Sequence, residues 1–308
     1  MIWIVIALLG LLLGFAFALF YIACGRCDRA TEDLEKMLSR PVYALSRDES
    51  LQAQRWLAEK APQRVWTTSH DGLPLAADFL PCENARGTIM LFHGWRSRPL
   101  ADFGPAVQSY YGKGLNLLLV HQRGRGPSGG RFVTFGIHER KDVHRWVQWH
   151  GECFGADAPI VMSGLSMGAS TVLMACGEPF SANVRGVIAD CGFTSPKEII
   201  SAVCRTAHVP TWPTVPFMGL FTKLLAGFGL SDYSTVQAMA QTHIPILFAH
   251  GEADGFVPCE MTKEAYAACA SSDKTLLLVK EARHGTSYLL ERPRYEATIT
   301  QFLNRILP

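Results

Sequence analysis

Hydrophobic and polar positions divide the chain into a long apolar head and a body of ordinary globular patterning. Residues 1–24 contain no charged side chain. In the body, short apolar runs alternate with stretches of helical periodicity, and near-continuous apolar runs are typical of strands buried on both faces. The runs that we expect to form strands are 64–69, 75–80, 88–92, 115–120, 160–163, 187–189, 244–249 and 275–279. The expected helices include 139–150, 167–176, 260–270 and 292–306.

This alternation predicts an α/β fold, with a mostly parallel central sheet and helices on both faces. The first two runs are the exception, because His70-Asp71-Gly72 between them is a hairpin signal. One interval, 195–241, is too long for a simple crossover and holds many aromatic and aliphatic residues among its prolines. We expect it to form a helical cap over a pocket, inserted into a body that spans residues 64–308.

The apolar head is long enough to cross a membrane. At about 1.5 Å per residue, a helix of 24 residues reaches about 36 Å, more than the ~30 Å of a hydrocarbon core. Basic residues follow the head, at Arg26, Arg29, Lys36, Arg40 and Arg47, and none lies within it. This bias predicts a single-pass anchor that holds the body on the cytoplasmic side. A cleaved signal peptide is the alternative, although such a peptide normally begins with basic residues.

Residues 25–63 separate the head from the body. We expect them to form two short polar helices that act as a linker, the first ending at Pro41 and the second before Pro62. Cys24 and Cys27 lie at the boundary with the two-residue spacing of a metal or redox pair. A zinc site needs four ligands, and no second pair lies nearby in the sequence. Two thiols next to the membrane, open to acylation, are the simpler interpretation.

Composition narrows the class of protein further. The 308 residues include 29 Lys and Arg against 27 Asp and Glu, a net charge of +2. No stripe of basic residues interleaved with aromatics is present, so nucleic acid is not expected as a partner. The mean hydropathy of +0.12 reflects the single apolar head, which excludes a multi-span membrane protein. The nine cysteines are odd in number and dispersed, so we expect reduced thiols and no disulfide framework.

The strongest chemical signal is Gly164-Leu165-Ser166-Met167-Gly168, which lies between an expected strand and an expected helix. A nucleophilic serine at a sharp strand-to-helix turn has a strained backbone and an exposed hydroxyl. The residues two positions before and after the serine must be small, because larger side chains would collide with each other at such a sharp turn. Both are glycine here. The motif predicts a nucleophile elbow with Ser166 as the nucleophile. The alternative is an ordinary glycine-rich turn in which the serine has no catalytic role.

A serine hydroxyl is a weak nucleophile until a neutral histidine accepts its proton and a carboxylate orients that histidine. His284 is the candidate base, since it follows the last expected strand and precedes the closing helix. Asp254 is the candidate acid, since it follows the preceding strand, and Asp190 is its main competitor. Both candidates would lie at the carboxyl ends of strands, where open α/β sheets place their sites. His250 and His243 are expected to be structural.

An acyl-transfer site also needs two backbone donors aimed at the developing oxyanion. One would be the amide of Met167, directly after the nucleophile. The second is expected in the loop after the strand 88–92, which reads His93-Gly94-Trp95, and we assign it to the amide of Trp95. The indole of Trp95 is either a wall of the pocket or a buried structural side chain.

Together these motifs resemble the α/β-hydrolase superfamily over about residues 64–308. The resemblance is nearest to bacterial and membrane-anchored serine hydrolases grouped with the serine aminopeptidases and the prolyl-oligopeptidase-like esterases. Residues 122–130 resemble the Arg-Gly-x-Gly-x-Ser loop after the fourth strand, except that His121 stands where the family usually has Asp. The residues on which the resemblance depends are His93-Gly94, the elbow 164–168, Asp254 with Val257-Pro258, and His284-Gly285.

The sequence therefore predicts a membrane-anchored serine hydrolase that cleaves a carboxylic ester or thioester through an acyl-enzyme, without cofactor or metal. The expected substrate is a small ester or acyl compound, and the apolar cap and nearby membrane permit a lipid-like one. An aminopeptidase-like enzyme that cleaves amides is the alternative among hydrolases. A non-catalytic binding module on the same scaffold is the alternative outside enzymes. Because every predicted catalytic residue lies in the body, the head is expected to be separable from the chemistry.

Overall fold

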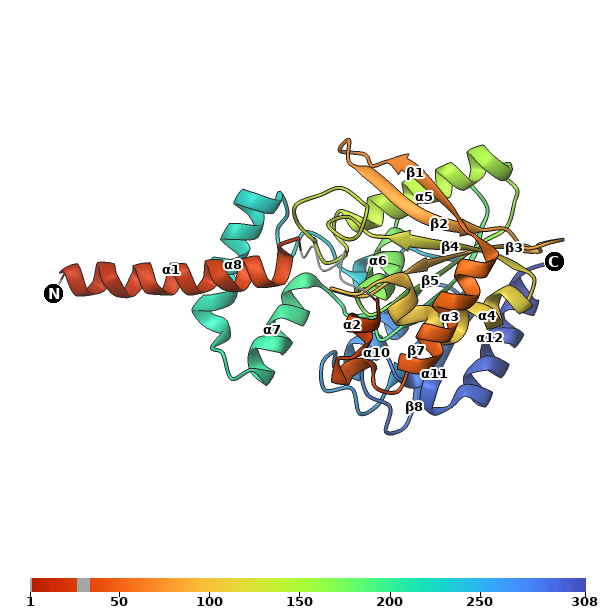
Figure 1. Cartoon of the computed structure of the whole chain (residues 1–308). Helices are drawn as coiled ribbons and strands as arrows, with labels where there is room; N and C mark the ends of the chain where they lie inside the picture. Colours follow the sequence, from red (N-terminus) through yellow and green to blue (C-terminus); the bar gives the residue numbers. More distant parts are fainter. Residues whose placement is uncertain (1, 27–33) are drawn as a thin grey trace.

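The computed structural model describes residues 2–26 and 34–308, and its centre is one eight-stranded sheet (Figure 1). The strand order is β1-β2-β4-β3-β5-β6-β7-β8. Strand β2 is antiparallel to both β1 and β4, and every other neighbouring pair is parallel. The predicted sheet and its opening hairpin are thus confirmed. The strands are β1 (Gln63–Thr68), β2 (Pro74–Leu80), β3 (Gly87–Phe92), β4 (Leu115–His121), β5 (Ile160–Leu165), β6 (Val184–Asp190), β7 (Ile246–Gly251) and β8 (Lys274–Val279).

Helices cover both faces of the sheet, and each face has its own hydrophobic core. Successive side chains of a strand point to opposite faces, so a strand between two helical layers is apolar along its whole length. In β3, Met90 and Phe92 pack into one core, while Ile89 and Leu91 pack into the other. The first layer contains α5 (Glu139–Phe154), α6 (Met167–Ala175), α9 (Thr235–Met239) and α10 (Cys259–Ala268). The second contains α3 (Arg47–Lys60), α4 (Pro99–Gly112) and α12 (Arg292–Ile306), with α11 (Ser287–Leu290) beside it.

The stretch predicted as a linker forms short helices that approach the body. After α2 (Leu34–Leu38) and a 3₁₀ turn (Pro41–Tyr43), α3 packs against α4 and buries Ala53 and Leu57. This stretch therefore also closes one side of the second core. Cys27, one of the two boundary cysteines, lies outside the described residues.

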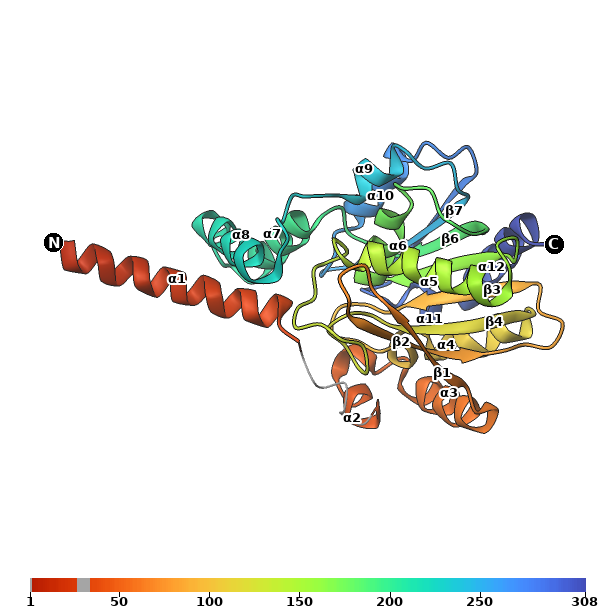
Figure 2. The same ribbon diagram turned by 90° about the horizontal axis from the view of Figure 1, so that it is seen from above.

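The first part of the interval predicted as a cap forms α7 (Pro196–Thr206) and α8 (Thr211–Ala226), which stand apart from the sheet. Its last part forms α9, which packs on the sheet in the first layer. The apolar head forms one helix, α1 (Ile2–Cys24), which lies alongside α8 and projects beyond it (Figures 1 and 2). By length and composition α1 is able to span a membrane, a test that a signal sequence near an N-terminus also passes. Its first residues are solvent-exposed in the isolated chain, and Trp3 is 78% exposed.

The last turns of α1 are packed into the body. Ala16, Phe20 and Cys24 are fully buried in a hydrophobic cluster with the cap and with residues 132–137. Directly after the helix, Gly25 pairs with Phe132 in an isolated antiparallel bridge. These turns therefore pack as part of the body, while the expectation that the head is separable from the chemistry stays a prediction. It followed from where the catalytic residues lie in the sequence, which says nothing about which segments pack beside them.

Candidate active site

Ser166 lies at the sharp turn between β5 and α6. Its backbone has φ 55° and ψ −118°, a conformation that is strained for a residue with a side chain and typical of a nucleophile elbow. The two neighbouring glycines are required by contact distances. A Cβ on Gly164 would lie 2.3 Å from the carbonyl oxygen of Gly168, and one on Gly168 would lie 1.8 Å from the carbonyl oxygen of Phe92. The turn therefore has the geometry that the sequence motif predicted.

Three predicted residues from distant parts of the sequence meet at this turn. His284 Nε2 lies 2.9 Å from Ser166 Oγ, and His284 Nδ1 lies 2.7 Å from Asp254 Oδ2. Asp254 follows β7 and His284 follows β8, so both side chains project from the carboxyl edge of the sheet. A carboxylate only accepts hydrogen bonds, so Nδ1 carries the imidazole proton and Nε2 is left to accept the hydroxyl proton of Ser166.

The buried carboxylate of Asp254 is held by several hydrogen-bond donors. Its Oδ1 accepts hydrogen bonds from the amides of Phe256, at 2.8 Å, and Val257, at 2.9 Å. Burial alone would raise the pKa of Asp254, but hydrogen bonds from His250 and His284 outweigh it and hold that pKa below its usual value. The carboxylate is therefore ionised at neutral pH, as an acid that stabilises a neighbouring imidazolium must be.

His250 is the second histidine on this carboxylate. Its Nε2 lies 3.2 Å from Asp254 Oδ2 and 3.0 Å from the carbonyl oxygen of Val257, both acceptors, so Nε2 carries a proton. Its Nδ1 is 2.7 Å from Thr262 Oγ1. The sequence predicts a structural role for His250. These contacts indicate that the role is to hold the carboxylate of Asp254.

Asp190, the other candidate for the acid that orients His284, forms hydrogen bonds with other residues. Its Oδ2 accepts a hydrogen bond from the hydroxyl of Tyr295 at 2.9 Å, and its Oδ1 lies 3.5 Å from Ser287 Oγ. Burial raises the pKa of Asp190. Asp190 lines the same cavity as Ser166, but Asp254 is the acid that hydrogen-bonds His284. The other histidine expected to be structural, His243, has an exposed side chain.

The loop predicted to supply an oxyanion donor follows β3 and is fixed by buried polar groups. His93 is fully buried, and burial lowers its pKa to about 3, so the ring is neutral. Its Nδ1 lies 2.9 Å from the carbonyl oxygen of Gly94, and its Nε2 accepts from the amide of Gln122 at 3.2 Å. The amides of Trp95 and Met167 remain the predicted oxyanion donors.

Asp102, on the first turn of α4, holds the same loop from the other side. Its Oδ2 accepts a hydrogen bond from the amide of Gly94 at 2.6 Å, and its Oδ1 accepts one from the hydroxyl of Ser97. Burial raises the pKa of Asp102 to about 6, although both hydrogen bonds favour the charged form. The amide of Trp95 lies between the two residues that Asp102 binds, so this carboxylate sets the position of the predicted donor.

Replacing Asp102 by alanine is expected to lower kcat by roughly 10- to 100-fold, because a displaced oxyanion donor weakens transition-state stabilisation more than substrate binding. Steady-state kinetics on a nitrophenyl ester measure this, with KM changing much less than kcat. A loss confined to KM would assign Asp102 to substrate binding and contradict the positioning role.

Two cavities of different character reach Ser166. The larger, of about 470 Å³, also touches His284 and holds polar side chains such as Tyr43, Ser97 and Thr286. The smaller, of about 150 Å³, is lined almost wholly by apolar side chains from α1, the cap and the elbow region. The rings of Trp95 and Phe256 line both cavities, so the indole of Trp95 is a pocket wall. The ring of Phe256 packs edge-on against His284, with centroids 5.1 Å apart.

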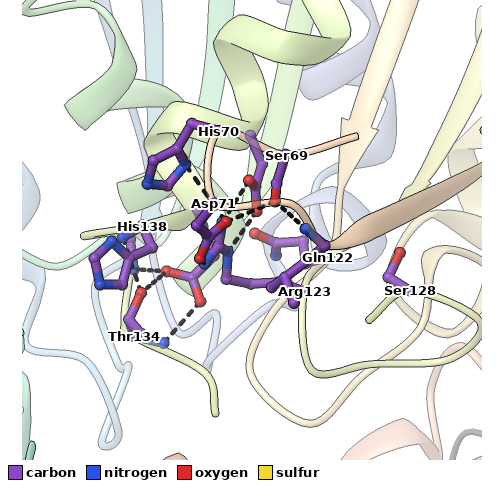
Figure 3. Close-up of polar contacts among 12 residues, drawn as sticks. Ser69, His70, Asp71, Gln122, Arg123, Ser128, Thr134 and His138 are labelled. Atoms are coloured by element: carbon purple, nitrogen blue, oxygen red, sulfur yellow. Dashed lines mark hydrogen bonds and ion pairs between the residues drawn. The ribbon is translucent and has the colours of Figure 1, made fainter. Parts of the chain in front are cut away.

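A second polar cluster surrounds Arg123 in the loop after β4 (Figure 3). The guanidinium donates to both oxygens of Asp142 at 2.6 Å and to both oxygens of Asp71 at 2.9 and 3.0 Å. His70, Asp71 and Asp142 are close enough together to hold a metal ion, but Arg123 already donates hydrogen bonds to the oxygens of both carboxylates. This arrangement favours a structural ion pair that fixes the loop. His121, which precedes this loop, bonds Asp78 with 3.0 Å between Nε2 and Oδ2.

The cluster around Asp254 and His284 includes one further potential metal ligand. Cys191 lies close enough to Asp254 and His284 for the three to share an ion. Burial raises the pKa of the Cys191 thiol well above its ordinary value, so the thiol stays protonated. Metals bind the thiolate, so the chemistry of this set does not fit a metal site.

Several known proteins are similar to this chain in sequence. Residues 229–291, which include Asp254 and His284, match the family described as serine aminopeptidase, S33. The uncharacterized protein YqkD of Bacillus subtilis is 28% identical over 220 residues, covering 71% of this chain and 72% of that protein. The uncharacterized protein YfhR of Escherichia coli K12 is 26% identical over 235 residues, covering 74% of each chain.

Solved structures extend the comparison to the whole fold. An esterase of Pyrococcus furiosus superposes with a TM-score of 0.67 at 20% identity, covering 81% of this chain and 93% of that one. A soluble variant of the monoglyceride lipase of Saccharomyces cerevisiae has a TM-score of 0.58 at 20% identity, covering 80% and 96%. An α/β-hydrolase of Penicillium has a TM-score of 0.63 at 16% identity, covering 80% and 98%. The chain has the α/β-hydrolase fold.

Within this α/β-hydrolase fold, the structure brings the predicted residues Ser166, His284 and Asp254 together. Sequence reasoning did not single out Asp102 as the residue that holds the predicted oxyanion loop, and it did not connect His250 with Asp254. An acidic residue in the first turn of a helix is a common capping feature, so Asp102 had no distinguishing signal in the sequence. For His250, the four-residue spacing to Asp254 at the end of a strand was the available clue.

Proposed function

We propose that the chain is a serine hydrolase that cleaves a carboxylic ester, or a thioester, through an acyl-enzyme. The observation that supports this most directly is the hydrogen-bonded series from Ser166 Oγ through the His284 ring to Asp254, at 2.9 and 2.7 Å, on a strained elbow. A chain of contacts in this order matches what a serine nucleophile needs for activation.

In the first half-reaction His284 Nε2 accepts the proton of Ser166 as Oγ bonds to the carbonyl carbon. The amides of Trp95 and Met167 stabilise the oxyanion of the tetrahedral intermediate. As this collapses, the bond to the alcohol breaks and His284 returns the proton to the leaving oxygen. Water, deprotonated by His284, then attacks the acyl-serine. When this second intermediate collapses, the bond to Oγ breaks, His284 returns the proton to Ser166 Oγ, and the carboxylic acid is released. Asp254 holds the ring tautomer and stabilises the imidazolium in both halves.

An aminopeptidase-like activity is the second candidate, because the matching family is described as serine aminopeptidase. An aminopeptidase must bind the ammonium group at the end of its substrate, and a free carboxylate would serve that purpose. Among the described residues that line the larger cavity, the acids are Asp102 and Asp190. Both are engaged, Asp102 by Gly94 and Ser97 and Asp190 by Tyr295. This favours esters over aminoacyl amides.

The location that we propose is a membrane, with α1 as a single-pass anchor and the catalytic body in the cytoplasm. The apolar length of α1 and the basic residues after it support this orientation. The eight cysteines in the described part of the chain carry free thiols, which suits a reducing compartment.

The test is rapid-mixing kinetics with p-nitrophenyl butyrate. We expect a burst of about one nitrophenolate per chain before steady turnover, since nitrophenolate is a good leaving group and acylation should be faster than the water attack that follows. Alanine and leucine p-nitroanilides, assayed alongside, should give no measurable turnover. Anilide turnover as efficient as ester turnover would establish the peptidase instead. Absence of a burst and of turnover with both substrate types would favour the non-catalytic binding module.

A further inference from the structure

The C-terminal end of α1 is bonded to the catalytic body through its backbone. The last four carbonyls of any helix lack partners within it. Here all four accept hydrogen bonds, and two of the donors belong to the predicted oxyanion loop. The carbonyls of Tyr21, Ile22, Ala23 and Cys24 accept, in order, from the Gly25 amide at 2.9 Å, the Arg96 guanidinium, Trp95 Nε1 at 2.7 Å and the Val133 amide at 2.7 Å.

The residue after this end continues the attachment. The Arg26 guanidinium donates to the carbonyl oxygens of Gly126 and Ser128, both at 2.9 Å, and of Gly130, at 3.2 Å. Those residues belong to the loop that Arg123 fixes to the body (Figure 3). The cationic groups of Arg26 and Arg96 also lie where the helix dipole is negative. The end of α1 is therefore held at a defined position relative to Ser166.

Side chains of the same turns pack into the body. The buried residues Ala16, Phe20 and Cys24 are spaced four apart, so they form one stripe of the helix. The ring of Phe20 lies 5.4 Å from that of Phe132, measured between centroids. Toward the cap, the ring of Phe17 lies 5.3 Å from that of Phe221.

The smaller cavity lies between this end of α1, helix α7 and Ser166. Helix α1 supplies Leu19, Ile22 and Ala23 to its lining, and α7 supplies aliphatic side chains opposite them, including Ile199 and Val203. At about 150 Å³ the cavity equals in volume an engineered apolar cavity in another protein that binds benzene, a guest of about six carbons.

The position of His284 decides which part of an ester would occupy this cavity. His284 lines the larger cavity and is absent from the lining of the smaller one. In the proposed mechanism His284 protonates the leaving oxygen, so the alcohol must lie on its side of Ser166. The larger cavity also has the polar groups that an alcohol portion would contact. The acyl chain is then directed into the smaller, apolar cavity.

We propose that the last two turns of α1 form one wall of the acyl-binding pocket, and that the substrate is an ester of a polar alcohol with an apolar acyl chain of about six carbons. This rests on the proposed serine hydrolase function and specifies its substrate class. The helix that the sequence presents as an anchor is thus, at its C-terminal end, a determinant of specificity. Its wall residues reach the acyl chain, while its first turns extend away from the body.

The experiment uses the full-length chain in detergent micelles and p-nitrophenyl esters from acetate to dodecanoate. Wild type should have its highest kcat/KM near hexanoate. Leu19→Trp places an indole in the cavity and should lower the hexanoate-to-acetate ratio of kcat/KM by roughly tenfold or more, since each buried methylene contributes roughly a fourfold factor. Leu19→Ala enlarges the cavity and should move the optimum toward octanoate. The matched control is Leu11→Trp, the same change at a position that is 72% exposed, and its ratio should stay within twofold of wild type.

Fluorophosphonate labelling of Ser166 in each variant separates a changed pocket from a misfolded site. One contrary result is a hexanoate-to-acetate ratio that is equal in Leu19→Trp, Leu11→Trp and wild type while labelling and ester turnover are intact. That result would overturn the proposed acyl pocket, and the proposed hydrolase function would still hold. If Leu19→Trp fails to label, the shift of optimum in Leu19→Ala decides the question, and an unshifted optimum there overturns the pocket. A wild-type chain that neither labels nor cleaves any ester overturns both proposals together.

Discussion

Replacing Ser166 by alanine is expected to lower ester turnover by roughly 10,000-fold or more, because no other group at the elbow can form the acyl-enzyme. The Oγ atom lies 2.9 Å from His284 Nε2, and alanine removes it without adding volume to the turn. Labelling by a fluorophosphonate should disappear as well. Both are measured on purified full-length protein, by nitrophenolate release and by gel fluorescence.

The control for this variant is Ser272→Ala, the same substitution at an exposed serine in the loop before β8. It should retain the labelling and turnover of the wild type. Melting temperatures of both variants should lie close to that of the wild type, which separates loss of chemistry from loss of fold. Full fluorophosphonate labelling of the Ser166→Ala protein would show that another residue is the nucleophile.

The second large effect is expected for Asp254→Asn, with kcat falling by roughly 1,000- to 10,000-fold. An asparagine amide facing His284 would favour the wrong ring tautomer, so that Nε2 carries a proton and no longer accepts one from Ser166. The amides of Phe256 and Val257 can still donate to the remaining side-chain oxygen, so the loop should keep its shape. The loss should therefore be in kcat, measured at saturating ester.

Asp190→Asn is the matched comparison, because it changes the competing acid in the same way. Asp190 bonds Tyr295 in the second core, so this variant should lose less than tenfold in kcat and show its main effect as a lower melting temperature. The reverse pattern, with Asp190→Asn nearly inactive and Asp254→Asn nearly unchanged, would assign the orienting role to Asp190.

Features that depend on neighbouring residues were predictable from the sequence. The elbow is one, because the collisions that require Gly164 and Gly168 arise within a few residues of Ser166 and the strand beside them. The strands are another, because burial between two helical layers makes both alternating sets of side chains apolar. The last two expected strands then indicated which loops to examine for Asp254 and His284.

Features that depend on packing between distant segments were not predictable in the same way. Asp102 holds the amide of Gly94 from a helix eight residues away, and an aspartate there has no separate sequence signal. The choice between Asp254 and Asp190 needed the distance to His284. The apolar residues of the cap were equally compatible with plain packing, and the structure shows that several of them line a cavity at Ser166.

By itself, the sequence determined an apolar head, an α/β body and a serine at a nucleophile elbow. Only the tertiary structure decided that the head and the site belong together. A helix of 23 apolar residues has nearly the same hydropathy whether all of it lies in lipid or its last turns lie against a protein. The two cases differ in which distant groups donate hydrogen bonds to the terminal carbonyls of the helix. Here two of those donors, Arg96 and Trp95, come from the loop beside Ser166.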